Sequence, residues 1–293
     1  MSQATSHATL GLAPQPRMSD NGEHYSQKCL QRYRTVIGGG RHRLNASYGS
    51  DPAHTLDIFL PDEAFRQDLP ILVFFHGGGW TNGYKEWSGI MAPTATRLPA
   101  ILVCPSYRLI PRVSYPTPLD DCMLAVKWVR EHATEYGGSP EKIFIGGHSA
   151  GGQIAALLTL EHQMLARHGL SALDFKGCHC VSASLHRRMI NAGIAPDHVP
   201  AGDPEAIQFD SPLALADKAQ GTSFLITWGG EESRLVENSR KMAQLLAQAG
   251  CPVTSHVYPG KGHFDMHTDL AEPNSPASRD LAHWMAQVLE AQP

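Results

Sequence analysis

The sequence of 293 residues has no apolar run that approaches the roughly 18 residues of a membrane-spanning helix. Its first twenty residues are polar and contain proline, and they lack the apolar stretch of a secretory signal. Basic clusters are few and short, at 41–43 and 186–188, and the net charge is −4. Together these absences argue against a membrane protein and against a nucleic-acid partner. They favour a cytoplasmic protein that acts on a small molecule.

Cysteine is sparse, with six residues spread over the chain and several of them in apolar patterns. Such a distribution favours buried thiols over a disulfide framework. The run Cys178-His179-Cys180 could suggest a metal site. Neighbours two apart on a strand share one face, however, and no second pair of ligands stands nearby. We therefore expect no metal and no cofactor.

What the chain does have is a hydrophobic content of 42%, enough for one large core. We expect residues 1–20 to be disordered or arm-like and residues 21–293 to form a single α/β domain, with 21–50 as a leading segment. The stretch 185–221 contains several prolines and has no clear period. We interpret it as a lid-like insertion, because loops this long inside compact domains are usually functional.

Apolar patterns predict the central sheet. Residues 71–75 and 100–104 are continuous apolar runs, typical of parallel strands covered on both faces, whereas 44–48 and 55–60 alternate as an antiparallel pair would. Strands and helices then alternate, with strands at 142–145, 177–183, 223–228 and 253–258 and helices at 118–135, 149–162, 234–249 and 277–290. This order predicts a doubly wound, mostly parallel sheet with helices on both faces.

Ser149 stands in the run Gly147-His148-Ser149-Ala150-Gly151, between a predicted strand and a predicted helix. That context is the one a nucleophile elbow requires. The glycines two before and two after the serine let strand and helix approach closely. The helix N-terminus also favours the negative charge that develops during acyl transfer. The alternative is a glycine- and serine-rich turn that simply caps a helix.

A second glycine-rich run, His76-Gly77-Gly78-Gly79-Trp80, follows the apolar strand 71–75. Three glycines allow the backbone N–H groups to face outward, as donors to an oxyanion must. Alone, such a run is an ordinary loop in most proteins. Upstream of a nucleophile elbow it is the expected oxyanion loop.

A serine nucleophile needs a histidine base, and the base needs a carboxylate to orient it. His263 lies in a glycine-rich loop between the strand 253–258 and the last helix, at a sheet edge where open α/β sheets place their sites. Glu232 follows the strand 223–228 and is our choice of acid, with Glu231 and Asp265 as alternatives. A metal cluster of Asp265 and His267 beside His263 is a weaker interpretation, since all three ligands would come from five residues.

Several motifs occur together in one order: HGGGW at 76–80, SYRL at 106–109 leading through Tyr115-Pro116 to Asp120-Asp121-Cys122, GHSAGG at 147–152, SPL at 211–213 and GKGHF ending at 264. On these motifs, about residues 55–290 resemble the α/β-hydrolase superfamily, within it the hormone-sensitive-lipase-like carboxylesterases and the related kynurenine formamidases (arylformamidases). The resemblance implies the backbone N–H groups of Gly78, Gly79 and Ala150 as oxyanion donors and a structural role for His76. It implies that Asp121 is a buried structural carboxylate, although an acid at a helix N-terminus explains it equally well.

Two positions depart from the family pattern. The family's usual triad acid is aspartate where we assign Glu232, and residues 182–186 replace a small and acidic pattern. A glutamate reaches one bond further and serves in some relatives. The second departure leaves the lining of the acyl pocket, and therefore the identity of the substrate, undetermined.

The leading hypothesis is a carboxylesterase that cleaves small acyl esters with Ser149, His263 and Glu232. Trp80, His148, Trp228 and Phe264 are predicted to line its pocket, although aromatic residues near such a sheet are more often ordinary core. One alternative is an arylformamidase acting on N-formylkynurenine or a similar aryl amide. Another is a catalytically inactive binding protein on the same fold. The oligomeric state is open, with a homodimer as one option.

Overall fold

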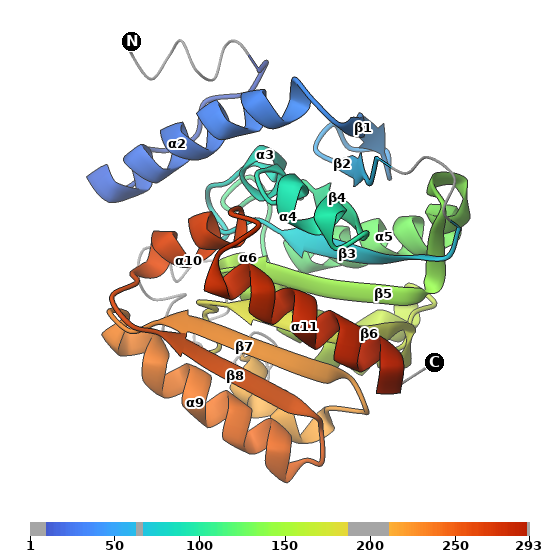
Figure 1. Ribbon diagram of the computed structural model, residues 1–293, viewed down its shortest axis with the longest axis vertical. Helices are drawn as coiled ribbons and strands as arrows, with labels where there is room; N and C mark the ends of the chain where they lie inside the picture. Colours follow the sequence, from blue (N-terminus) through green and yellow to red (C-terminus); the bar gives the residue numbers. More distant parts are fainter. Residues whose placement is uncertain (1–9, 63–66, 187–210, 292–293) are drawn as a thin grey trace.

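An eight-stranded sheet forms the centre of the molecule, with strand order β1-β2-β4-β3-β5-β6-β7-β8 (Figure 1). The computed structural model describes residues 10–62, 67–186 and 211–291. The strands are β1 (Arg41–Ser47), β2 (Thr55–Leu60), β3 (Leu69–Phe75), β4 (Ile101–Pro105), β5 (Gly138–His148), β6 (Phe175–Val181), β7 (Ser223–Gly229) and β8 (Val253–Tyr258). The β1–β2 and β2–β4 pairs are antiparallel, and all the others are parallel. The predicted mostly parallel, doubly wound sheet is confirmed.

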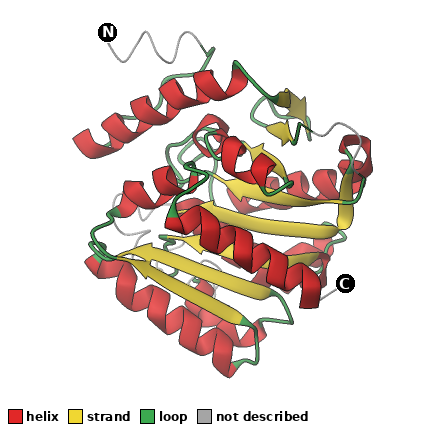
Figure 2. Cartoon of the chain, viewed as in Figure 1, coloured by secondary structure: helices red, strands yellow, loops and turns green. Residues whose placement is uncertain are grey.

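Helices cover both faces of this sheet (Figure 2). One face carries α5 (Thr117–His132), α6 (Ala150–Leu160), α9 (Ser233–Gln248) and the short 3₁₀ helix η5 (Pro212–Lys218). The other carries α2 (Asp20–Ile37), α3 (Lys85–Gly89), α4 (Ala92–Arg97), α10 (His263–Leu270) and α11 (Pro276–Ala291). The connections between strands include α7 (His162–Arg167), η1 (Ala133–Tyr136) and η2 (Ala172–Asp174).

Strand β3 shows why its apolar run predicted a central strand. Ile71, Val73 and Phe75 belong to the core on the α5 and α6 side. Leu72 and Phe74 point to the opposite core, under α2, α3, α10 and α11. Successive side chains of a strand alternate between faces, so a strand buried on both faces must be apolar at every position.

Helix α2 is the main element that the sequence analysis did not predict within its leading segment 21–50. Its buried residues include Tyr25, Cys29, Leu30 and Tyr33, at the spacing of one helical face. The Ser19 side chain accepts a hydrogen bond from the Gly22 N–H, and Asp20 begins an acidic first turn. This capping serine was the available signal, but the helix is mostly polar and only its narrow apolar face contacts the core.

Two segments of interest lie partly outside the described residues. Of the predicted arm 1–20, residues 1–9 are not described, whereas Leu10, Leu12 and Met18 pack against the core beneath α2 and α3. Of the insertion 185–221, residues 187–210 are not described. The two described ends of this insertion meet, because the Leu213 N–H donates to the Leu185 carbonyl at 3.2 Å.

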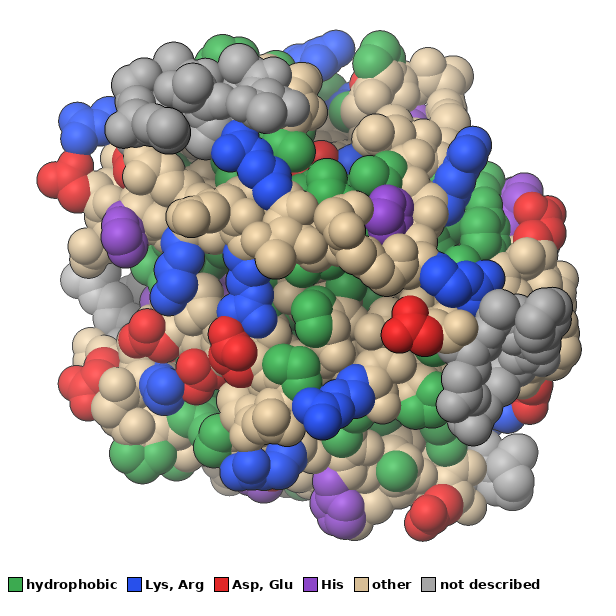
Figure 3. All heavy atoms as spheres, turned by 45° about the horizontal axis from the view of Figure 1, so that its top comes forward, with side chains coloured by type: hydrophobic (Ala, Val, Ile, Leu, Met, Phe, Trp, Pro, Cys, Tyr) green, Lys and Arg blue, Asp and Glu red, His purple; other side chains and the backbone are tan. Residues whose placement is uncertain are grey.

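The described surface mixes charges of both signs. Acidic and basic side chains are interspersed over the face drawn in Figure 3. Among the helices in the described ranges, none combines the length and apolar character needed to cross a membrane.

Candidate active site

Ser149 occupies a sharp turn between β5 and α6. Its φ of 57° and ψ of −118° are unfavourable for a residue with a side chain, so the surrounding structure must impose them. A Cβ atom at position 147 would lie 2.2 Å from the backbone of Gly151, and one at 151 would lie 2.1 Å from the Phe75 carbonyl oxygen. The predicted strand-turn-helix context is therefore present, and only glycine fits at both flanking positions.

The glycine loop at 76–80 lies against this turn. A Cβ atom at Gly77 would come within 3.1 Å of the Ser149 Cβ. Gly78 and Gly79 have φ of 117° and 64°, in the region that favours glycine. Beyond Gly79 there is open space, since an added Cβ would meet nothing within 4 Å. The loop thus passes beside the serine and leaves room for a ligand over Gly79.

His76 holds the start of that loop. Its Nδ1 lies 2.8 Å from the Gly77 carbonyl oxygen, which can only accept, so this nitrogen carries the proton. Tyr107 stacks on the imidazole with ring centroids 4.3 Å apart, and its hydroxyl donates to the His76 carbonyl at 2.8 Å. Burial lowers the pKa of His76 to about 4, so the ring is neutral at pH 7. These contacts agree with the structural role that the resemblance implied.

Glu232 and His263 come together across the ends of β7 and β8. The Glu232 Oε1 and the His263 Nδ1 are 2.5 Å apart. The other carboxylate oxygen, Oε2, accepts from the Gly229 N–H and from the Ser182 hydroxyl, each at 2.7 Å. Glu232 is buried, and three donors satisfy its carboxylate as a buried anion requires.

The two alternative acids are placed differently. Glu231 is exposed, and its backbone N–H donates to the Lys261 carbonyl. Asp265 caps the first turn of α10, where its Oδ2 accepts from the Gly262 N–H at 2.8 Å. Of the three candidate carboxylates, Glu232 is the one that bonds to the His263 imidazole.

His148 connects the serine turn to the His263 loop. Its Nε2 donates to the His263 carbonyl at 2.9 Å, and the two rings have centroids 4.6 Å apart. Burial, with smaller contributions from His263 and His267, holds the pKa of His148 well below its usual value. His148 is buried and therefore supports the loop that carries His263.

His267 extends the same cluster toward helix α2. Its ring stacks on His148 at 5.2 Å between centroids, and its Nδ1 pairs with the Tyr25 hydroxyl at 2.7 Å. Burial lowers the pKa of His267 to about 3. A neutral, buried imidazole bonded to tyrosine fits a packing role rather than that of a metal ligand.

The aromatic residues predicted to line the pocket are more buried than expected. Trp80 and Trp228 are each 4% exposed and belong to the core on the α5 and α6 side. The Trp80 indole donates to Gln153 at 3.1 Å. Phe264 is partly buried and stacks on Tyr25 at 4.5 Å between centroids. The two tryptophans contribute chiefly to the core beneath the site.

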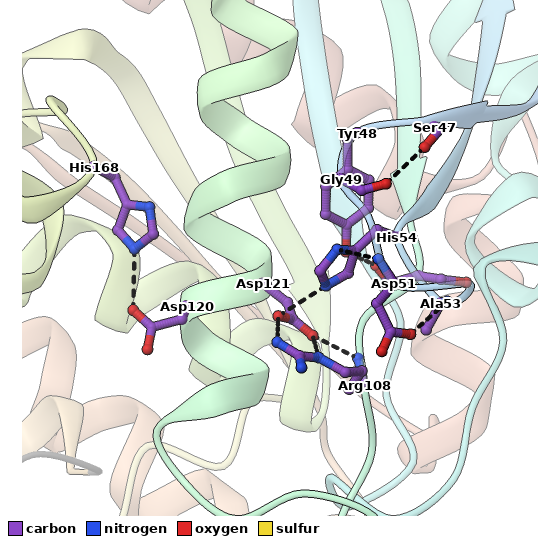
Figure 4. A network of polar contacts seen from close by, with 11 residues as sticks. Ser47, Tyr48, Gly49, Asp51, Ala53, His54, Arg108, Asp120, Asp121 and His168 are labelled. Carbon is purple, nitrogen blue, oxygen red and sulfur yellow. Dashed lines mark hydrogen bonds and ion pairs between the residues drawn. The ribbon is translucent and has the colours of Figure 1, made fainter.

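Asp121 anchors Arg108, the residue that follows Tyr107 in the sequence, and Figure 4 shows Asp121 between Arg108 and His54. Its carboxylate accepts from the Arg108 backbone N–H at 2.9 Å and from the Arg108 guanidinium at 2.8 and 2.5 Å, and the His54 Nε2 lies 3.0 Å away. Burial alone would raise the pKa of Asp121, but Arg108 and His54 hold it below its usual value. Asp120, not Asp121, is the acid in the first turn of α5, so the contacts of Asp121 fit the buried structural carboxylate rather than an acid at the helix N-terminus.

The described cysteines and histidines do not gather into a metal site. All six cysteines are free and buried. The Cys178 and Cys180 sulfurs lie 3.7 Å apart, while the His179 Nε2 bonds instead to Thr227 at 3.0 Å. Within the three described ranges, no group of three or more His, Cys, Asp or Glu residues is arranged to hold a metal.

Comparisons with known proteins agree on the fold. A family model described as "alpha/beta hydrolase fold" matches residues 72–267. Carboxylesterase NlhH of Mycobacterium tuberculosis is 42% identical over 94 residues, which cover 32% of this chain and 30% of the relative. Isoprenylcysteine alpha-carbonyl methylesterase of Arabidopsis thaliana is 24% identical over 273 residues, covering 85% of this chain and 62% of the relative. The chain thus spans less than two thirds of the length of these relatives.

A solved structure matches nearly the whole chain. Esterase B from Lactobacillus rhamnosis superposes with a TM-score of 0.73 at 17% identity, covering 99% of this chain and 96% of that one. At this identity the likeness concerns the fold alone. It supports the same arrangement of sheet and helices that the topology gives.

Proposed function

We propose, since the chain belongs to the α/β-hydrolase family, that it is a serine esterase that cleaves small acyl esters with Ser149, His263 and Glu232. The two sequence relatives named above are both described as esterases, which favours an ester over an amide substrate. The observation that carries the proposal is the hydrogen bond between the buried Glu232 carboxylate and the His263 imidazole. His148, which precedes Ser149, bonds to the His263 carbonyl and so connects the serine turn to His263.

The chemistry follows from these positions. Glu232 accepts a hydrogen bond from the His263 Nδ1, which leaves the Nε2 lone pair free to take the Ser149 proton. The Ser149 oxygen then attacks the ester carbonyl. The N–H groups of Gly78, Gly79 and Ala150 would stabilise the oxyanion of the tetrahedral intermediate. His263 next protonates the leaving alcohol, and a water molecule hydrolyses the acyl-enzyme by the same steps in reverse order.

A substrate panel tests this proposal. We expect kcat/KM on p-nitrophenyl acetate and butyrate to exceed that on N-formylkynurenine by at least about tenfold. We also expect a fluorophosphonate to label Ser149. Higher kcat/KM on the formamide would favour the arylformamidase instead. Failure of both hydrolysis and labelling would favour the inactive binding protein.

Ser182 is a positioning residue that the sequence analysis noted only as a departure from the family pattern. Its hydroxyl donates to the Glu232 Oε2 from the end of β6. We expect Ser182→Ala to lower kcat about tenfold with little change in KM, because a hydrogen bond to a charged group contributes about 1.5–3 kcal/mol. Steady-state kinetics on p-nitrophenyl butyrate measure this change.

The matched control is Ser223→Ala, which removes a hydroxyl that is also buried but lies at the opposite end of the strands. It should leave kcat unchanged. An equal loss in both variants, or a Ser182→Ala effect confined to KM, would contradict the assigned role.

A further inference from the structure

The turn at residues 82–84 packs directly against the glycine loop at 76–80. The Asn82 N–H donates to the Gly78 carbonyl at 2.9 Å. A Cβ atom at Gly78 would lie 2.1 Å from the Asn82 carbonyl oxygen, and one at Gly83 would lie 2.2 Å from the Gly77 carbonyl oxygen. Backbone packs directly on backbone here, with no flexible side chain between. A shift of the turn must therefore shift Gly77 and Gly78 as well.

The N-terminal segment binds this same turn. The Gln15 side chain makes two hydrogen bonds to Gly83, accepting from its N–H and donating to its carbonyl, each at 2.7 Å. The Asn82 side chain donates to the Pro16 carbonyl at 2.6 Å. The Tyr84 hydroxyl donates to the Ala13 carbonyl at 2.7 Å. Four hydrogen bonds thus join residues 13–16 to a turn about seventy positions away in the sequence.

The segment is itself held in place on both sides. Leu12 and Met18 pack against the core, and the Met18 N–H donates to Glu23 at 2.7 Å. Ser19 then caps α2, and Tyr25 of that helix bonds to His267 in the cluster behind His263. Residues 13–16 thus bind the turn at 82–84, and the helix that follows them bonds to His267.

We propose that residues 13–16 are a positioning element of the active site, in which Gln15 sets the place of the oxyanion loop through Gly83. This inference rests on the proposed esterase function. Oxyanion donors act only when they are aimed at the position that the charged oxygen will occupy, and misplacement by about 1 Å can cost about 100-fold in rate. The two bonds of Gln15 fix both the N–H and the carbonyl of Gly83, which limits rotation of the turn.

The test compares three single substitutions in the full chain. Gln15→Ala removes both bonds to Gly83, and Tyr84→Phe removes the bond to Ala13 while it keeps the aromatic ring. Arg17→Ala is the control, because Arg17 directly follows the segment 13–16 but its side chain is 74% exposed and pairs with Asp20 at the surface. Kinetics on p-nitrophenyl butyrate are combined with inhibition by phenylboronic acid, whose serine adduct resembles the tetrahedral intermediate.

We expect Gln15→Ala to lower kcat about tenfold and to weaken boronate inhibition by a similar factor, with KM changed less than about twofold. Tyr84→Phe should change both quantities in the same direction by a smaller factor, and Arg17→Ala should change neither. A rise in KM alone, or a loss of kcat without weaker boronate inhibition, overturns the proposal. An inactive wild-type protein that does not bind the boronate would instead refute the esterase function itself.

Discussion

Ser149→Ala is expected to lower kcat by about 10⁴- to 10⁶-fold, the largest effect of any single substitution in this chain. No acyl-enzyme can form without the hydroxyl, and the rate that remains would come from the oxyanion donors and from substrate binding. The fold should survive, because alanine and serine carry the same Cβ and the substitution therefore adds no steric strain at this φ of 57°. The measurement is kcat on p-nitrophenyl butyrate, with thermal unfolding as a check of the fold.

Ser139→Ala provides the comparison, since Ser139 is also buried but lies at the far end of β5, the strand that leads into Ser149. Its kcat should equal that of the wild type. If Ser149→Ala kept more than about 1% of wild-type kcat, another nucleophile would have to be sought.

Glu232→Gln is expected to lower kcat by about 10⁴-fold with little change in KM. The reason lies in the donors around this side chain. Gly229 and Ser182 both donate to Oε2, so the amide oxygen of glutamine would take that position and its NH₂ group would face His263. The imidazole Nδ1 would then have to accept, which places its proton on Nε2, where it can no longer take the serine proton.

Glu231→Gln is the matched control for this substitution. It removes the same charge from the adjacent residue, which is exposed. We expect its kcat to stay within about twofold of the wild type, because an exposed charge contributes little. A large loss in Glu231→Gln with a mild one in Glu232→Gln would reverse the assignment of the acid.

The serine turn could be predicted from the sequence because its requirements are local. Gly147 and Gly151 meet each other and the end of β3 within a few ångströms, and both lie within two residues of Ser149. The apolar runs of β3 and β4 likewise predict strands that are buried on both faces. His263 and Glu232 followed from chain order, and the structure brings these two side chains together.

The support around the site could not be predicted in the same way. Ser182, His148 and Gln15 each act through a partner between about 50 and 115 positions away. No local pattern distinguishes a serine that bonds a buried glutamate from one that caps a turn. Helix α2 was also missed, because most of its residues are polar and only its narrow apolar face reaches the core.

The sequence alone therefore determined the sheet, the order of its strands along the chain and the glycine-flanked serine, since these depend on periodicity and on steric limits within a few residues. Only the tertiary structure decided which of the three acids reaches His263, that Trp80 and Trp228 are core residues, and that the N-terminal segment binds the turn beside the glycine loop at 76–80. Hydrogen bonds and burial depend on which atoms meet after folding, and for these contacts the meeting residues are far apart in the chain.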